Sequence, residues 1–166
     1  MDIDYLAVLF RWFHILPAIV AVGGTIFMRF ALHPAAAELP EAQRTALQEA
    51  VRSRWARWIH ASILFLLASG FYNFFTLINR YKVPSTYHML FGIKFLLALA
   101  IFALASLLTG RKGVAQRMRQ NAKTWLNINI LLAVLLVCIS GVMRNVSMNS
   151  PLKSVPSTPA AATAEP

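Results

Sequence analysis

Four long apolar runs, each flanked by cationic residues, constrain this chain more than any other feature. The runs cover residues 12–28, 58–79, 86–110 and 124–143, and an arginine or lysine lies close outside each end. A helix needs about 20 apolar residues to cross the hydrocarbon core of a bilayer, with a working range of about 17–25. Backbone polar groups cannot stay unpaired in lipid, so each run is expected to be a helix. We therefore predict an all-α fold, an integral membrane four-helix bundle.

The composition fits a membrane protein rather than the other classes to which basic chains belong. Of the 166 residues, 58% are hydrophobic and 13% are charged, which leaves little for a separate soluble domain. The net charge is +10, but most of the cations lie at the ends of the runs, where they contact anionic lipid headgroups. No basic run carries interleaved aromatic residues, so the expected partner is the lipid bilayer and not a nucleic acid. The single cysteine, Cys138, excludes an intrachain disulfide.

The distribution of charge between the loops predicts the orientation. The segments after the first and third runs are rich in arginine and lysine, whereas the link between the second and third runs carries only Arg80 and Lys82. Positive charge marks the cytoplasmic side, so both termini are predicted to lie outside. Short connections also make consecutive helices antiparallel neighbours.

Two further segments complete the predicted organisation. Between the first two runs we expect a short amphipathic cytoplasmic helix that starts after Pro40 and places Leu47, Val51 and Trp55 on one face. The tail, residues 150–166, is rich in proline, alanine, serine and threonine, so it cannot bury an apolar face and is expected to be disordered. This leaves residues 1–149 as the four-span membrane domain.

Two histidines near the predicted outer face carry the first functional hypothesis. His14 and His88 each lie two residues inside a membrane boundary, on runs that cross in the same direction. One turn deeper come the small residues Ala18 and Gly92, which leave room between helices for a flat macrocycle. Two histidines from different bundle helices commonly ligate the iron of haem b, so we expect spans one and three to pack in contact around haem. The alternative is that both histidines extend to the water at the membrane interface.

Three cationic residues extend that hypothesis. Arg144 and Arg11 lie at the same predicted outer face, where they could bind the haem propionates through paired hydrogen bonds. Lys94 lies about 9 Å deeper than His88, and no aspartate or glutamate occurs in any of the four runs. A lysine at that depth needs a partner, which an amide such as Asn73, water or the carboxylate of a ligand would provide. A ligand or substrate role for Lys94 and an interfacial one both remain open.

Two motifs resemble a known family. The stretch RWFHILPAIVAVGG at residues 11–24 and the stretch YHMLFGIK at residues 87–94 resemble the copper-resistance D (CopD-like) membrane proteins. These resemble, in turn, the HemJ type of protoporphyrinogen oxidase. The resemblance implies a helical bundle in the bacterial inner membrane, with bound haem b and an oxidoreductase activity in the HemJ case and copper homeostasis in the other. It carries over His14 and His88 as haem ligands and Lys94 as a catalytic, substrate-side residue.

Other functions stay open at this point. Copper is the rival cofactor, because thioether and imidazole ligands favour Cu(I) and His88, Met89, Met143 and Met148 are all predicted on the outer side. A non-catalytic bundle that assembles with a partner is a third possibility. The partner would be a redox protein of the membrane or further copies of this chain. His60 is predicted at the opposite face, so it cannot share a metal with the other two histidines.

Overall fold

The computed structural model describes residues 4–110 and 113–152, and this part of the chain is helical throughout apart from short connections. The predicted all-α fold is confirmed. The elements in chain order are α1 (Tyr5–Phe27), the π-helical turn η1 (Met28–Leu32), α2 (His33–Ala37), α3 (Glu41–Arg80), α4 (Ser85–Thr109), α5 (Val114–Gln120) and α6 (Ala122–Met148).

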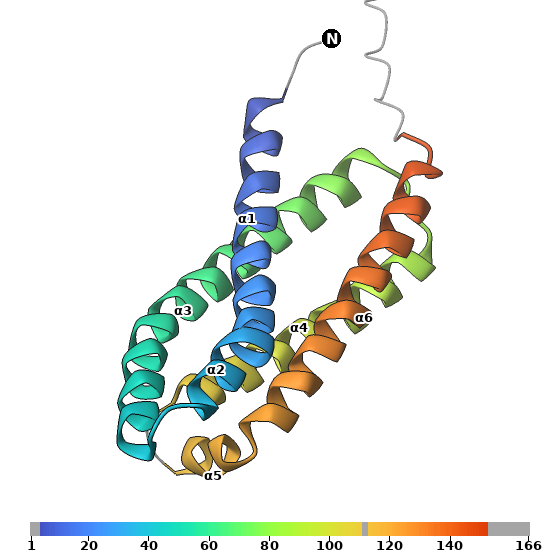
Figure 1. Ribbon diagram of the computed structural model, residues 1–166. Helices are drawn as coiled ribbons and strands as arrows, with labels where there is room; N and C mark the ends of the chain where they lie inside the picture. Colours follow the sequence, from blue (N-terminus) through green and yellow to red (C-terminus); the bar gives the residue numbers. More distant parts are fainter. Residues whose placement is uncertain (1–3, 111–112, 153–166) are drawn as a thin grey trace, which may run out of the picture.

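Four of the helical segments are long and apolar enough to cross a membrane, as expected of a multi-pass membrane protein. They contain the four apolar runs, and α1, η1 and α2 together form the first of them. The long helices α1, α3, α4 and α6 lie side by side and form the predicted four-helix bundle (Figure 1). The short helix α5 closes one end of this bundle, at the connection between α4 and α6.

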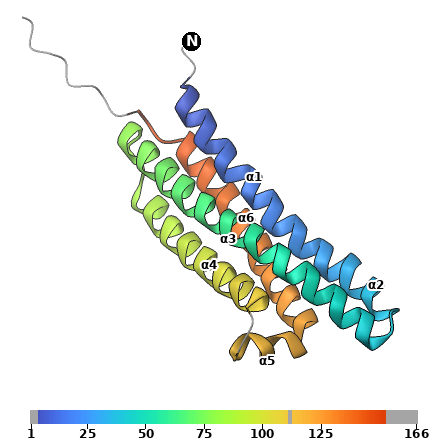
Figure 2. The ribbon, with the colours of Figure 1, turned by 90° about the vertical axis from the view of Figure 1, so that its left-hand side faces the viewer.

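The bundle consists of two antiparallel pairs, α1 with α3 and α4 with α6, in which the helices pack most closely (Figure 2). The pairs meet along α3 and α4 on one side and along α1 and α6 on the other. The expected direct packing of spans one and three is therefore wrong, because α1 and α4 lie diagonally across the bundle. Short connections put each helix beside its successor, so the two helices that run in the same direction become the diagonal pair.

The two ends of the bundle are held by different contacts. At the end that carries both termini, here called the terminal end, Asp4 caps α1 by accepting a hydrogen bond from Ala7 N at 3.0 Å and pairs with Arg80. At the same end, Lys82 N donates to the Pro151 carbonyl at 2.9 Å. The opposite end, formed by the α2–α3 connection and by α5, is called the loop end. The predicted disorder of the tail concerns mainly residues 153–166, which lie outside the described residues.

Helices α1 and α3 extend further than the apolar runs do. The predicted amphipathic segment is helical and runs without a break into the second span, as expected, so the two form the 40-residue helix α3. Its Trp55 ring covers Gly24 of α1 so closely that a β-carbon at Gly24 would overlap the ring. The neighbouring Gly23 has no atom within 4 Å of such a β-carbon. Gly24 is therefore the position at which the two helices approach each other through the absence of a side chain.

Candidate functional site

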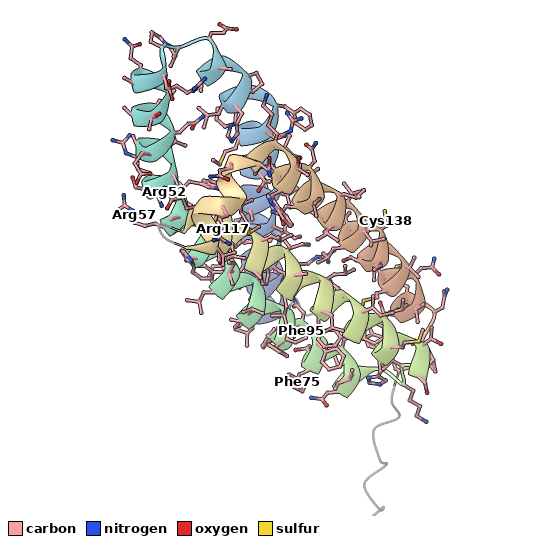
Figure 3. All side chains as sticks on the ribbon, turned by 90° about the horizontal axis from the view of Figure 1, so that it is seen from below. Arg52, Arg57, Phe75, Phe95, Arg117 and Cys138 are labelled. Atoms are coloured by element: carbon pink, nitrogen blue, oxygen red, sulfur yellow. The ribbon has the colours of Figure 1, made fainter. Side chains whose placement is uncertain are left out.

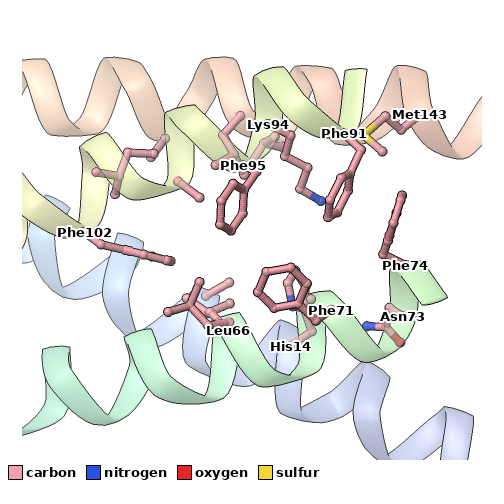
Figure 4. A pocket seen from close by; sticks show the side chains of 18 of the residues that line it. His14, Leu66, Phe71, Asn73, Phe74, Phe91, Lys94, Phe95, Phe102 and Met143 are labelled. Carbon is pink, nitrogen blue, oxygen red and sulfur yellow. The ribbon is translucent and has the colours of Figure 1, made fainter. Parts of the chain in front are cut away.

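A cavity of about 290 Å³ lies between the two helix pairs. All four long helices line it, and its wall is almost entirely apolar (Figure 4). Its phenylalanine and tyrosine residues come from α3 and α4 and are Phe71, Phe74, Tyr87, Phe91, Phe95 and Phe102. Apolar clefts near this size with a few polar groups are typical of small-molecule sites, whose volumes run from about 300 Å³ upwards.

His14 reaches this cavity from α1, and its hydrogen bonds define the proton on its ring. Its Nδ1 lies 2.9 Å from the hydroxyl oxygen of Ser69 on α3. That hydroxyl donates its one proton to the carbonyl of Phe65, one turn earlier on the same helix. With its proton directed to that carbonyl, Ser69 accepts from His14; this arrangement assigns the ring proton to Nδ1 and a lone pair to Nε2. The backbone carbonyl of Leu66 also acts on this imidazole as a hydrogen-bond acceptor.

The space beside the imidazole is kept open by a small residue. A β-carbon at Gly70 of α3 would lie 3.4 Å from Cε1 of His14, which is ordinary van der Waals contact. A longer side chain at that position would therefore run into the ring. In the dipeptide Ser69-Gly70, Ser69 therefore orients the His14 ring through a hydrogen bond, and Gly70 leaves space for it.

Lys94 lines the cavity from α4, across the bundle from His14. Its side chain extends along Phe91 into the space between the helix pairs (Figure 4), and it lies within electrostatic reach of His14. Asn73 of α3 also lines the cavity. Among the described residues no ion pair or hydrogen bond reaches the Lys94 ammonium. An ammonium in apolar surroundings is costly, so this position favours a bound molecule that supplies an acceptor.

The structure does not bring His88 to this cavity. Its side chain is exposed, and its ring stands edge-on to Phe74, with the centroids 6.0 Å apart. The preceding residue, Tyr87, is 6% exposed and lines the cavity instead. Neighbouring positions of a helix point about 100° apart, so when Tyr87 faces inward His88 faces outward. The predicted histidine pair is therefore not assembled at the cavity.

The other predicted residues lie outside the cavity. Arg11 and Arg144 are exposed, and neither forms an ion pair within the described part of the chain. His60 is exposed and is hydrogen-bonded at 2.7 Å to the carbonyl of Ala56 in its own helix. Cys138 lies on the outer side of α6 (Figure 3). None of these four side chains contributes to the cavity wall.

The residues of the copper hypothesis do not converge either. Met143 is buried and lines the cavity, whereas Met89 and Met148 are 60% and 71% exposed. The described residues contain no group of three or more histidine, cysteine, aspartate or glutamate side chains that could hold a metal ion. The soft ligands predicted on the outer side are thus dispersed over several faces of the bundle.

The sequence did not identify Ser69 and Tyr87 as parts of the site. The pair Ser69-Gly70 is recognisable in the sequence as a close contact between helices, and that contact turns out to be with His14. Nothing in the sequence marks Tyr87 as the inward-facing residue of its helix.

No protein-family model matches the chain, and no curated protein or solved structure matches it either. The function is therefore inferred from the geometry of the cavity.

Proposed function

We propose that this membrane protein binds haem b in the cavity between its helix pairs, with Nε2 of His14 as an iron ligand, and that it works in a redox reaction. The observation that carries the proposal is the hydrogen bond between His14 and Ser69. Histidines that bind a metal through one nitrogen almost always donate the proton of the other to an oxygen, which fixes the ring and its tautomer. His14 has this arrangement before any metal is bound.

The remaining wall of the cavity suits the same ligand. Its phenylalanine rings offer flat, apolar surfaces, and the small residues Ala18 and Gly70 also line the cavity. When bound, haem supplies one-electron chemistry, whose potential depends on the axial ligand and on the burial of the site. The protein's own contribution is an oriented imidazole in a wall that excludes water.

Lys94 gives the cavity its charged group. Its ammonium offers three hydrogen-bond donors to a carboxylate, either of the haem or of a molecule that reacts beside it. This position inside the cavity supports the catalytic, substrate-side role, and an interfacial role does not account for it. Because His88 faces outward, one histidine ligates in this proposal, and not two.

The charges of the loops indicate on which side of the membrane each end of the bundle would work. The proposal places the protein in the bacterial inner membrane with both termini outside, where a redox protein of the membrane would exchange electrons with the terminal end. No contact in the structure favours copper transport over haem binding, since the methionines do not converge.

An optical spectrum of the purified protein tests the proposal. After expression with ample haem, the wild-type protein should show a Soret band with a haem-to-protein ratio near one. His14→Ala should lose most of the haem, whereas His60→Ala, the matched surface histidine, should retain it. Ser69→Ala should weaken haem affinity by about 10–100-fold, the usual effect of removing a partner that orients a metal ligand.

His88→Ala separates this proposal from the two-histidine arrangement. We expect this variant to keep its haem, because the His88 side chain lies outside the cavity. Loss of haem in His88→Ala equal to that in His14→Ala would contradict ligation by His14 alone. Absence of a Soret band in the wild-type protein, with stoichiometric copper in its place, would instead favour the copper hypothesis.

A further inference from the structure

A basic cluster lies at the loop end, far from the cavity residues, where the end of the first span meets the start of α6. It consists of Arg29 in η1, His33 at the start of α2 and Lys123 in α6, together with the amide of Asn127. The Arg29 Nε donates to Asn127 Oδ1 at 2.6 Å, which ties the two segments together. The segments are antiparallel, so His33 and Lys123 each lie one turn beyond this hydrogen bond in the same direction.

The charges of this cluster are not compensated by the protein. His33 is acted on by the charges of Lys123 and Arg29, and no carboxylate in the described part of the chain acts on it. The two ion pairs among the described residues, Glu49 with Arg52 and Asp4 with Arg80, involve none of the cluster. Cations that are held together without a carboxylate repel one another, and a bound anion relieves that repulsion.

The donors of the cluster are oriented by the local backbone. The π-helical turn η1 contains Arg29, and single π turns inside α-helices often occur at functional sites. The guanidinium also lies over the ring of Phe30, 5.1 Å from its centroid. With Nε used by Asn127, the two terminal nitrogens of Arg29 remain as donors beside the ammonium of Lys123.

We propose that this cluster binds the phosphate group of an anionic phospholipid. Phosphate oxygens accept the donors that arginine and lysine leave unused here. The lipid is favoured as the source of the phosphate because the same helix exposes apolar rings next to the cluster. Phe27 is 59% exposed and Phe30 is 62% exposed, so an acyl chain can lie against them while the headgroup contacts the cations.

The test compares lipids on the full-length protein. The wild-type protein in detergent should gain thermal stability when phosphatidylglycerol is added, and should gain little from phosphatidylcholine or from inorganic phosphate at the same concentration. Arg29→Gln combined with Lys123→Gln should bind phosphatidylglycerol about 30-fold more weakly, since each basic side chain near an anionic surface contributes about fivefold. Native mass spectrometry of lipid-bound protein measures the same loss directly.

Two further variants keep the result interpretable. Arg54→Gln combined with Arg57→Gln removes the same charge from exposed positions of α3 and should bind phosphatidylglycerol as the wild-type protein does. Lys123→Gln alone changes an exposed side chain, so it should reduce binding about fivefold while the protein stays folded. Equal lipid binding by the wild-type protein and the cluster double variant would overturn the proposal. So would stabilisation by inorganic phosphate as large as that by the lipid.

Discussion

Two cations inside the bundle, the buried Arg52 and the half-buried Lys94, show how differently the two ends of this bundle are built. Arg52, near the loop end, donates to the carbonyl of Thr109 at 2.6 Å and pairs with Glu49 (Figure 3). It therefore satisfies carbonyl groups that the end of α4 would leave without a partner. Lys94, toward the terminal end, projects into an apolar cavity, and no partner reaches it from the described residues. The protein itself satisfies the charge of Arg52, whereas no described residue satisfies the charge of Lys94.

The packing of the helices around the two cations also differs. One turn along α3 from Arg52, Trp55 packs closely over Gly24 of α1. Around Lys94 the helix pairs separate and leave about 290 Å³. Proteins often accept lower stability at a functional site than the same residues could provide. Replacing the two cations should therefore change the free energy of unfolding in opposite directions.

The largest effect is expected from Arg52→Ala. The change removes a charged hydrogen bond to the Thr109 carbonyl, which contributes about 1.5–3 kcal/mol. It also removes the ion pair with Glu49, which adds little because the Glu49 side chain is 57% exposed. We expect a loss of about 3 kcal/mol in the free energy of unfolding. Reversible unfolding in mixed micelles measures it. Arg54→Ala removes an exposed arginine from the same helix and should reduce the free energy of unfolding only slightly. Equal losses in the two variants would show that Arg52 acts only through its charge.

Gly24→Ala should have the next largest effect. The added β-carbon overlaps the Trp55 ring, and overpacking of this kind costs about 1–3 kcal/mol. Gly23→Ala is the matched control, because it has no neighbour within 4 Å and alanine favours the helix. Thermal unfolding of both variants side by side should show a loss only for Gly24→Ala. A similar loss for Gly23→Ala would mean that the two positions share a contact with a further chain.

The spans could be predicted from the sequence because lipid permits so few backbone structures. Their ends could not, since helices continue through Arg29 to Ala37 and from Glu41 into the second span. The cations mark where a membrane boundary lies, but a helix can cross that boundary whenever its backbone remains hydrogen-bonded. His33, which lies beyond the end of the first apolar run, is for this reason helical and half-buried.

The candidate site was predicted in part for a related reason. Sequence position gives the depth of a residue in the membrane, and His14 and Lys94 were both identified through their depth. The direction in which a residue points depends on the rotation of its helix, which packing decides. Tyr87 takes the inward position of its turn, so His88 does not. A weak amphipathic pattern in an apolar helix cannot distinguish two such neighbours.

Lys94→Met should raise the free energy of unfolding, whereas Arg52→Ala should lower it. The ammonium has no partner that the structure describes, and a lysine at the centre of a membrane helix costs about 3 kcal/mol. Because Lys94 is only half-buried, we expect a gain in stability of about 1 kcal/mol. Unfolding in mixed micelles measures the gain in stability. Haem titration measures the loss of affinity, because the variant should bind haem more weakly. Lys94→Arg keeps the charge and should not be stabilised.

A destabilised Lys94→Met would show that the ammonium already has a partner within the protein. That outcome would make Lys94 equivalent to Arg52 and would remove the contrast between the two ends. The stability measurement does not depend on haem, so it tests the contrast even if the cavity binds another molecule.

The smallest effect concerns Asp4, which holds the terminal end through a helix-capping hydrogen bond and an ion pair. The hydrogen bond from Ala7 N lowers the pKa of Asp4, and the ion pair with Arg80 lowers that pKa further. A carboxyl whose folded pKa lies below its unfolded value, about 3.9, adds stability above that value and loses it as the pH falls through the folded pKa. Thermal unfolding between pH 6 and pH 3 should therefore show a small decline in the wild-type protein.

Asp4→Asn identifies the source of that decline. Asparagine caps a helix about as well as aspartate, so the variant keeps the start of α1 but has no charge to lose. Its stability should depend less on pH than that of the wild-type protein over the same range. If the decline persisted unchanged, it would have to come from other carboxyls, such as Glu49 beside Arg52. The pH dependence would then belong to the loop end, where buried hydrogen bonds already hold the helices together, and not to the terminal end.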